Sequence, residues 1–236
     1  MARPQETVKS ISTGNSELDK NLGGGIPMGS LMLVEGQSDS GKSVLLQQFT
    51  WGSLRDSFKV SVLTTEDTVK SFIRQMASLD KDIIDYLLLN RLKIYQVKAS
   101  QVKNSSEQSL DRLLGALKRQ RGMDFVVVDS VTSFIAHSST EDVISFFEEC
   151  KSLCDEGMTV ALVAHSYAFS ADILVRISSM CDAHLRLTLD KMGEKLLKVM
   201  EVAKIRGAQQ STGNITSFDI LPGLGMKIIP FSKARA

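Results

Sequence analysis

One eight-residue segment constrains the fold of this chain more than any other. It fits the pattern G-x-x-x-x-G-K-[ST] and reads Gly36, Gln37, Ser38, Asp39, Ser40, Gly41, Lys42, Ser43. Residues 31–35 (LMLVE) before it, apolar except for Glu35, predict a short buried strand. The spacing of Leu45, Leu46 and Phe49 after it predicts the inner face of a helix. A strand, a glycine-rich loop and a helix in this order are typical of a phosphate-binding loop in an α/β core.

The residue types of this loop suit phosphate chemistry. Gly36 and Gly41 let the backbone curl so that its N–H groups face phosphate oxygens. A helix that begins near Lys42 directs its positive dipole end at the same anion. Lys42 would then reach the β- and γ-phosphates, and the Ser43 hydroxyl would ligate Mg²⁺. The competing interpretation is a Gly/Ser turn with a solvated lysine, which the strand and the helix on either side disfavour.

Two apolar strands end in acidic residues. Residues 125–128 lead into Asp129, which is the Walker B pattern and predicts a carboxylate near the Mg²⁺ and its waters. Residues 60–65 lead into Glu66 and Asp67. If that strand neighbours the phosphate loop, Glu66 points toward the γ-phosphate and can orient an attacking water. The alternatives are that Asp129 caps a turn and that the acids favour the start of a helix near Thr68, a role for which Asp67 is the better candidate.

The order of the elements predicts the fold class. Strand and helix patterns alternate up to residue 164, and the continuous apolar character of the strands is typical of a parallel sheet covered on both faces. From residue 183 onward, strands follow one another at 184–189, 195–205, 216–221 and 226–229. We therefore predict an α/β fold with a mostly parallel central sheet, flanking helices and a C-terminal antiparallel extension. Residues 1–10 are expected to form a loose arm, and residues 11–236 a single domain.

Composition narrows the function classes. The net charge of the 236 residues is +1, which predicts no bulk attraction to nucleic acid or anionic membrane. The longest apolar runs are far below the roughly 18 residues of a spanning helix, and residues 1–6 lack the apolar stretch of a signal peptide. Three cysteines, Cys150, Cys154 and Cys181, indicate a reducing cytoplasm and a packing role rather than a disulfide framework or a metal site.

Three further segments carry a resemblance to a known superfamily. Residues 11–19 (ISTGNSELD) with 22–30 (LGGGIPMGS), and residues 202–207 (VAKIRG), resemble the opening segment and the K-x-R-G segment of the RecA/KaiC superfamily of ATPases. The resemblance covers residues 11–230 and implies a RecA-like core that binds ATP and Mg²⁺. It also implies that Lys204 and Arg206 act in trans, on the ATP of a neighbouring subunit. Without the resemblance, this pair would be interpreted as two solvated side chains on an edge strand.

Within the superfamily, the chain resembles the FlaH (ArlH) family of the archaellum, the archaeal flagellum. The residues that carry this narrower resemblance are 64–66 (TTE), 224–232 (LGMKIIPFS) and 235–236 (RA). It implies a hexameric ring in the cytoplasm at the base of the archaellum, where it would regulate motor assembly or rotation. The implied partners are the motor ATPase FlaI and the membrane platform protein FlaJ, so that the membrane is reached only through partners.

Departures from the superfamily pattern predict weak or conditional hydrolysis. KaiC-type sites carry two consecutive glutamates where this chain has Glu66 and Asp67, and the shorter side chain could misplace a water. Residues 208–210 (AQQ) replace a Thr-x-His segment. His165, at the end of a predicted strand, either senses the γ-phosphate or is a hydrogen-bonded structural histidine.

Two other functions remain open from the sequence. An autonomous KaiC-like ATPase or autokinase would need a hydroxyl at the γ-phosphate across the interface, for which Ser211 and Thr212 are the candidates. A RecA/RadA-like DNA-binding ATPase would need basic, glycine-rich loops. Residues 166–179 have Arg176 as their one basic residue and lack glycine, so no nucleic-acid partner is predicted.

Overall fold

The computed structural model describes residues 9–97, 107–136, 138–192, 195–212 and 215–229. Most of the predicted arm (residues 1–8) lies outside these ranges, and so do residues 230–232 and 235–236 of the FlaH-like ending, whose residues 224–229 are described. Ser10, the last residue of that arm, pairs with Pro27, so that β1 (Ser10–Ile11) and β2 (Ile26–Pro27) form a small antiparallel sheet.

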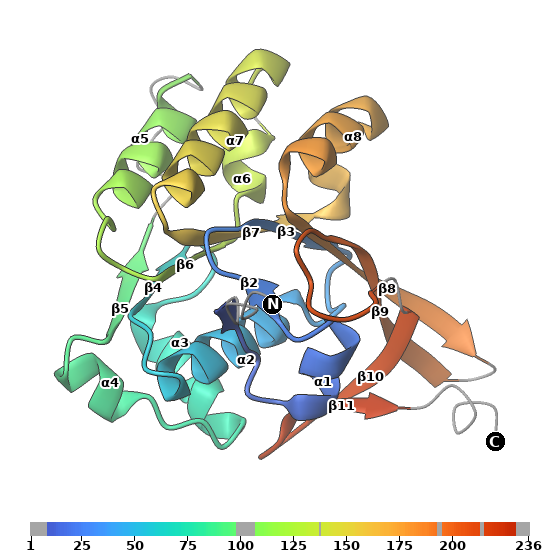
Figure 1. Cartoon of the computed structure of the whole chain (residues 1–236). Helices are drawn as coiled ribbons and strands as arrows, with labels where there is room; N and C mark the ends of the chain where they lie inside the picture. The colour runs from blue at the N-terminus through green and yellow to red at the C-terminus, as the bar shows by residue number, and fades with distance from the viewer. Residues whose placement is uncertain (1–8, 98–106, 137, 193–194, 213–214, 230–236) are drawn as a thin grey trace, which may run out of the picture.

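A twisted sheet forms the centre of the molecule (Figure 1). Its strands are β3 (Leu31–Gly36), β4 (Val60–Thr64), β5 (Leu92–Gln96), β6 (Phe125–Asp129), β7 (Thr159–His165), β8 (Ala183–Met192), β9 (Lys195–Ile205), β10 (Ile215–Leu221) and β11 (Gly225–Ile229). Within the described residues, nine strands run in the order β11-β10-β9-β8-β3-β7-β6-β4-β5. Pairing is parallel from β8 to β5 and antiparallel from β8 to β11. The predicted α/β fold class is confirmed.

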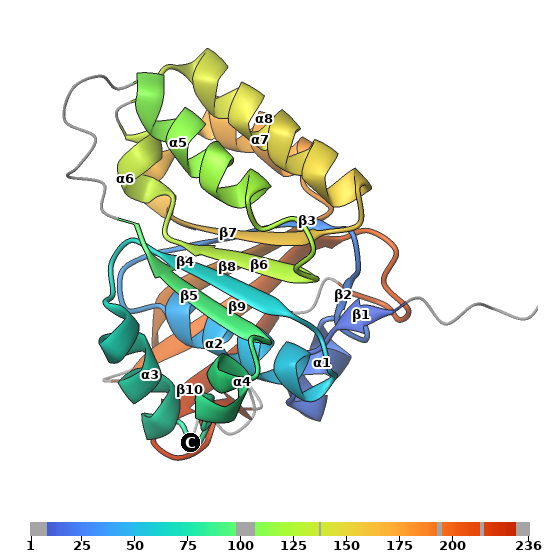
Figure 2. The ribbon, with the colours of Figure 1, turned by 90° about the vertical axis from the view of Figure 1, so that its left-hand side faces the viewer.

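Helices cover both faces of the parallel strands (Figures 1 and 2). The helices are α1 (Ser16–Asn21), α2 (Lys42–Arg55), α3 (Val69–Ser78), α4 (Ile84–Leu88), α5 (Glu107–Lys118), α6 (Thr132–Ile135), α7 (Thr140–Asp155) and α8 (Ala171–Met180). Figure 2 shows α5 to α8 on one side of the sheet and α1 to α4 on the other. Alternate residues of β3 divide accordingly: Leu31 and Leu33 pack with α5 and α7, whereas Met32 and Val34 pack with α2.

The antiparallel extension bends toward α2 rather than continuing the plane of the sheet (Figure 1). The amide of Asn15 donates to the carbonyl oxygen of Met226 at 3.0 Å, which fastens β11 beside the start of α1. Phe218 on β10 is buried in the same core cluster as α2. The extension therefore forms a wall beside the beginning of α2, where the phosphate loop lies.

Several short elements lack a strong sequence signal and were not predicted, namely α1, α4, α6 and α8. Helix α8 begins at the N-cap Ser170 and occupies most of residues 166–179, the segment that a DNA-binding ATPase would use as a loop. Its inward residue Ile177 is buried, while Val175 is 70% exposed. None of the helices in the described ranges combines the length and apolar character of a bilayer-spanning segment. Cys150 and Cys154 on α7 and Cys181 at the end of α8 are free thiols buried in one core cluster.

Candidate functional site

The phosphate loop has the backbone geometry that its glycines predict. Gly41 is the N-cap of α2 and has a φ of 98°, a left-handed conformation that disfavours other residues. A Cβ atom at Gly36 would collide with the carbonyl oxygen of Leu187 on β8. The loop is closed by Ser40 Oγ and Lys42 Nζ, which donate to the carbonyl oxygen of Gln37 at 2.8 and 2.6 Å. The loop is therefore tightly curled, and its Gln37 carbonyl group holds the ammonium group of Lys42.

A cavity of about 580 Å³ opens at this loop, at the carboxyl edge of the parallel strands. This volume lies in the range of roughly 300–1,000 Å³ that is usual for small-molecule sites. The residues that line it are Ser38, Asp39, Gly41, Lys42, Ser43, Val44, Glu66, Asp129, Ser130, His165, Lys198 and Ile220. The structure thus brings five of the eight predicted loop residues together with Asp129 and Glu66. The other three, Gly36, Gln37 and Ser40, support the shape of the loop.

Asp129 and Ser43 form the part of the cavity that suits a metal ion. Both line the cavity, and the Ser43 hydroxyl is close enough to the Asp129 carboxyl group to lower its pKa. Burial raises the pKa of Asp129 to about 6, and the charge of Glu66 adds to this effect. A carboxylate and a hydroxyl are oxygen ligands, which Mg²⁺ prefers, and Mg²⁺ is usually held by one or two such groups together with phosphates and waters. The residues present fit the predicted Mg²⁺, whose charge would favour the ionised form of Asp129.

Burial also shifts the pKa of Lys42, but in the opposite direction. It lowers this pKa, although the charges of Asp129 and Glu66 oppose the effect. Lys42 is 6% exposed, and one of its ammonium hydrogens is used by Gln37. An ammonium group has three donors, so an anionic ligand could take up the others. The loop end of the cavity is therefore cationic and partly desolvated, which strengthens its attraction for phosphate.

Glu66 reaches the cavity although its strand is not next to the strand that leads into the phosphate loop. The strand before it, β4, does not neighbour β3, because β7 and β6 lie between them. All four strands are parallel, so their carboxyl ends still meet at one edge, and Glu66 lines the cavity opposite Lys42. Its Oε1 lies 3.7 Å from His165 Nε2. His165 stacks on Tyr167, and its Nδ1 is buried without a hydrogen-bond partner among the described residues, so the hydrogen-bonded structural histidine is not what the structure shows.

The predicted helix-capping role of Asp67 is wrong. The N-cap of α3 is Thr68, whose hydroxyl accepts a hydrogen bond from the backbone N–H of Ser71 at 3.0 Å. Both carboxylate oxygens of Asp67 instead accept from the side-chain amide of Gln75, each at 3.0 Å. The cap position is one residue later than predicted, and the Asp67 carboxylate is occupied by Gln75 in the second turn of the helix.

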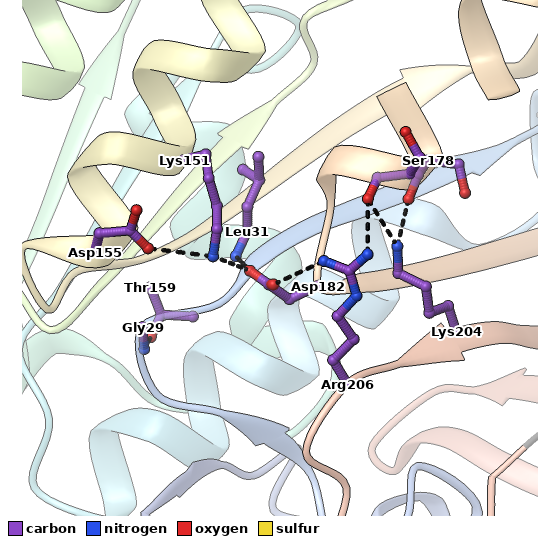
Figure 3. Close-up of polar contacts among 10 residues, drawn as sticks. Gly29, Leu31, Lys151, Asp155, Thr159, Ser178, Asp182, Lys204 and Arg206 are labelled. Atoms are coloured by element: carbon purple, nitrogen blue, oxygen red, sulfur yellow. Dashed lines mark hydrogen bonds and ion pairs between the residues drawn. The ribbon is translucent and has the colours of Figure 1, made fainter. Parts of the chain in front are cut away.

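Lys204 and Arg206 lie far from this cavity, near the amino end of β3 (Figure 3). Lys204 pairs with His184, which is level with Leu33. The backbone N–H of Arg206 donates to the carbonyl oxygen of Asp182, and the N–H of Asp182 donates to that of Leu31. Since β3 has six residues with a rise of about 3.3 Å each, its two ends are roughly 17 Å apart. Ser211 and Thr212 follow Arg206, and Thr212 lies against Gly23.

Comparisons with known proteins identify the family of this chain. A family model described as "ATPase: KaiC" matches residues 11–233. The archaeal flagellar ATP-binding protein FlaH of Sulfolobus acidocaldarius is 34% identical over 229 residues, which is 96% of this chain and 99% of that protein. The FlaH protein of Methanocaldococcus jannaschii is 27% identical over 222 residues, which is 92% of this chain and 94% of that protein. The chain belongs to the KaiC family of ATPases and, within it, to the FlaH proteins.

The structure of this FlaH-family chain also matches a solved relative. The crystal structure of flagellar accessory protein FlaH from Methanocaldococcus jannaschii has a TM-score of 0.81 and 26% identity, and the match covers 94% of this chain and 100% of that one. The resemblance of residues 11–19, 22–30 and 202–207 to the RecA/KaiC superfamily is thus confirmed, as is the RecA-like class of the fold.

Four cavity residues of this FlaH-family chain were not predicted from the sequence. Val44 and Ser130 directly follow the predicted Ser43 and Asp129, whereas the other two come from distant strands. Lys198 on β9 and Ile220 on β10 come from the antiparallel extension and line the cavity beside the phosphate loop. Ile220 and Phe218 also lie within 3.2 and 3.0 Å of where a Cβ of Gly41 would stand. The strands of Lys198 and Ile220 have an ordinary pattern of residues. The bend of the sheet that brings them to the phosphate loop leaves no signal in the sequence.

Proposed function

We propose that this chain binds Mg²⁺–ATP in the cavity and that the bound nucleotide joins it to a neighbouring copy in a ring, with a hexamer as the expected size. The curled loop, the desolvated Lys42 and the Ser43–Asp129 pair support the first part. Both FlaH relatives are described as ATP-binding proteins.

The observation that carries the second part is the position of Arg206. It lies beyond the amino end of β3, whereas the phosphate loop begins at the carboxyl end of the same strand. A side chain cannot bridge roughly 17 Å, so Arg206 cannot reach phosphates held at the loop of its own subunit. It is 56% exposed and ready to contact another molecule. A guanidinium and an ammonium group suit the spread charge of a γ-phosphate, so Lys204 and Arg206 would complete a neighbour's site.

The residues of the cavity would divide the work as follows. Backbone N–H groups of the loop and Lys42 bind the phosphates, while Ser43 and Asp129 hold Mg²⁺, Asp129 through a water. When bound, Mg²⁺ would neutralise phosphate charge and orient the phosphates. Glu66 would orient the attacking water, and it is 53% exposed with His165 at 3.7 Å. A carboxylate held so loosely positions water poorly, which supports weak or conditional hydrolysis.

In the cell, we propose a regulatory or assembly subunit of the archaellum motor. The relatives named after the archaeal flagellum support this role. The ring would lie in the cytoplasm at the base of the archaellum, with the motor ATPase FlaI and the platform protein FlaJ as partners.

Sedimentation velocity over a range of protein concentrations, with and without Mg²⁺–ATP, tests the ring. We expect assembly of the wild type to require Mg²⁺–ATP and to fail in both Lys42→Ala and Arg206→Ala. The two variants should differ in nucleotide binding by the dilute monomer, which Arg206→Ala keeps and Lys42→Ala loses. The same oligomer in the presence and absence of Mg²⁺–ATP would contradict the proposal.

An ATPase that works on its own is the second candidate, because Glu66 does line the cavity opposite Lys42. ATP turnover against protein concentration distinguishes the two functions. Turnover that rises cooperatively and disappears in Glu66→Gln would identify a working ring ATPase. Tight binding of ATP without turnover at any concentration would identify a nucleotide-loaded regulator.

A further inference from the structure

The last turn of α8 holds both cations of the K-x-R-G segment (Figure 3). Lys204 Nζ donates to the carbonyl oxygens of Ser178 and Ser179 at 2.6 and 3.3 Å. Arg206 Nη2 donates to the carbonyl oxygen of Ser179 at 2.9 Å. The last carbonyls of a helix lack partners within the helix and carry its negative dipole end, so they bind cations well. The end of α8 thus fixes two long side chains that would otherwise sample many rotamers.

Asp182, two residues beyond α8, provides a charged contact for Arg206. Its Oδ1 lies 3.7 Å from Arg206 Nη1. Its Oδ2 accepts hydrogen bonds from the backbone N–H of Leu31 at 2.9 Å and from Lys151 Nζ at 2.8 Å. Since Oδ2 is occupied on both sides, the carboxylate is oriented with Oδ1 toward the guanidinium. The side chain of Asp182 is only 13% exposed, so solvent screens this contact less than it screens a surface ion pair.

Lys151 on α7 keeps the carboxylate in place. It contacts Asp155 at 3.3 Å as well as Asp182. Burial alone would lower the pKa of Lys151, but its hydrogen bonds to the two aspartates raise it above the usual range. Lys151 therefore stays charged, and Asp182 is fixed from α7, from β3 and from its own backbone bonds to Leu31 and Arg206.

The anchored guanidinium keeps donors for another molecule. Arginine has five N–H donors, and within the described residues Arg206 makes one hydrogen bond and one ion pair. Its side chain is 56% exposed. A cation that is held on one side and open on the other is arranged to meet an anion without first losing rotamer freedom.

We propose that Asp182 is a positioning residue for Arg206, and that with the end of α8 it orients Arg206 and Lys204 toward the triphosphate of a neighbouring copy. The inference rests on the proposed function, in which this pair completes the neighbour's site.

A double-mutant cycle tests the proposal. Self-association in Mg²⁺–ATP is measured by sedimentation for the wild type, Asp182→Asn, Arg206→Ala and the double variant. Asp182→Asn keeps the shape of the side chain and an oxygen for the N–H of Leu31 but removes the charge. We expect Arg206→Ala to raise the dissociation constant of self-association about 10-fold or more, and Asp182→Asn about 3- to 10-fold. In the Arg206→Ala background, Asp182→Asn should add less than about 2-fold, because residues that act as a unit are not additive.

Two controls separate positioning from general stability. Glu149→Gln removes another carboxylate of α7, two residues before Lys151 in the chain, which pairs with Lys118 at 2.7 Å, and should leave self-association unchanged. Nucleotide binding by the dilute monomer should also be unchanged in Asp182→Asn, since the cavity is at the other end of β3. If Asp182→Asn fails to fold, Asp182→Ser, whose hydroxyl can still accept from Leu31, takes its place in the cycle.

The outcomes are distinguishable. If Arg206→Ala leaves self-association unchanged, the proposed function fails. If Arg206→Ala acts as expected but Asp182→Asn has the same effect in both backgrounds, Asp182 does not act through Arg206 and the inference is overturned. Tighter self-association of Asp182→Asn would also overturn it, because Asp182 would then restrain Arg206 rather than position it.

Discussion

The two ends of β3 each lie beside a cationic site, and these two sites are built in opposite ways. At the carboxyl end, Lys42 is 6% exposed and lines a cavity together with the carboxylates of Asp129 and Glu66. At the amino end, Arg206 is 56% exposed and is fixed by a helix end and by Asp182. We call the first the enclosed end, because Lys42 is buried there, and the second the open end. In the proposed function, the enclosed end binds the nucleotide of its own subunit and the open end meets the nucleotide of another copy. Each chain would then contribute to two nucleotide sites, with its phosphate loop to one and with Lys204 and Arg206 to the other.

The largest effect is expected from the enclosed end. Lys42→Ala removes the cation of the phosphate loop and leaves the carboxylates of Asp129 and Glu66 facing the phosphates. Loss of a desolvated charge contact should weaken ATP binding on the order of 100-fold. Isothermal titration of the dilute monomer measures this, with the exposed Lys20→Ala on α1 as the control. If Lys42→Ala and the wild type bind ATP with equal affinity, the phosphate-loop end is not the end that binds ATP in the monomer.

The next effect concerns the wall that the antiparallel extension supplies. Phe218 is 1% exposed and reaches Gly41, so Phe218→Ala should cost about 3 kcal/mol or more of unfolding free energy. It should also weaken ATP binding, because the loop loses its support. Phe147→Ala, in the core on the other face of the sheet, is the matched control. It should cost a similar free energy of unfolding in urea with ATP affinity intact; a matching loss of affinity would make the effect one of global stability.

A third prediction concerns the residue that ties the phosphate loop to β8. Glu35 is 2% exposed and accepts from His184 Nε2 at 2.9 Å and from Arg186 Nε at 3.0 Å. Burial alone would raise the pKa of Glu35, but His184 and Arg186 lower it below its ordinary value of 4.5. This contribution to stability is therefore present above pH 4.5 and is lost as pH falls through the lowered pKa.

Glu35→Gln should accordingly lower the unfolding free energy by about 2 kcal/mol at pH 7, with a difference that shrinks below pH 4.5. Urea unfolding from pH 3 to pH 7 measures this. A difference that stays constant across that range would show that the charge of Glu35 is not what matters.

The smallest effect is expected at the start of α3, next to Glu66. Thr68→Ala removes the N-cap hydrogen bond and should cost about 1 kcal/mol of unfolding free energy. Because Thr68 is not among the residues that line the cavity, ATP affinity should change little. Thermal unfolding and isothermal titration of the same variant check both statements, and a large loss of affinity would show that the cap also places Glu66.

By itself, the sequence determined the elements and the chemistry of the enclosed end. The strands that lead into Gly36, Glu66 and Asp129 carry continuous apolar runs, and the phosphate loop is a contiguous motif, so that both could be predicted from local pattern. Parallel strands bring their carboxyl ends to one edge whatever their order, which is why Glu66 reached the cavity although β4 does not adjoin β3.

Only the tertiary structure decided the order of the strands, the wall of Lys198 and Ile220, and the anchoring of Arg206. These depend on contacts between residues far apart in the chain, such as Lys151 with Asp182 and Asp182 with Leu31. Such contacts leave no periodicity and no motif, because each side chain alone fits an ordinary helix or strand. The K-x-R-G segment identified Lys204 and Arg206 from the sequence. Only the fold showed that they lie at the opposite end of β3 from the phosphate loop.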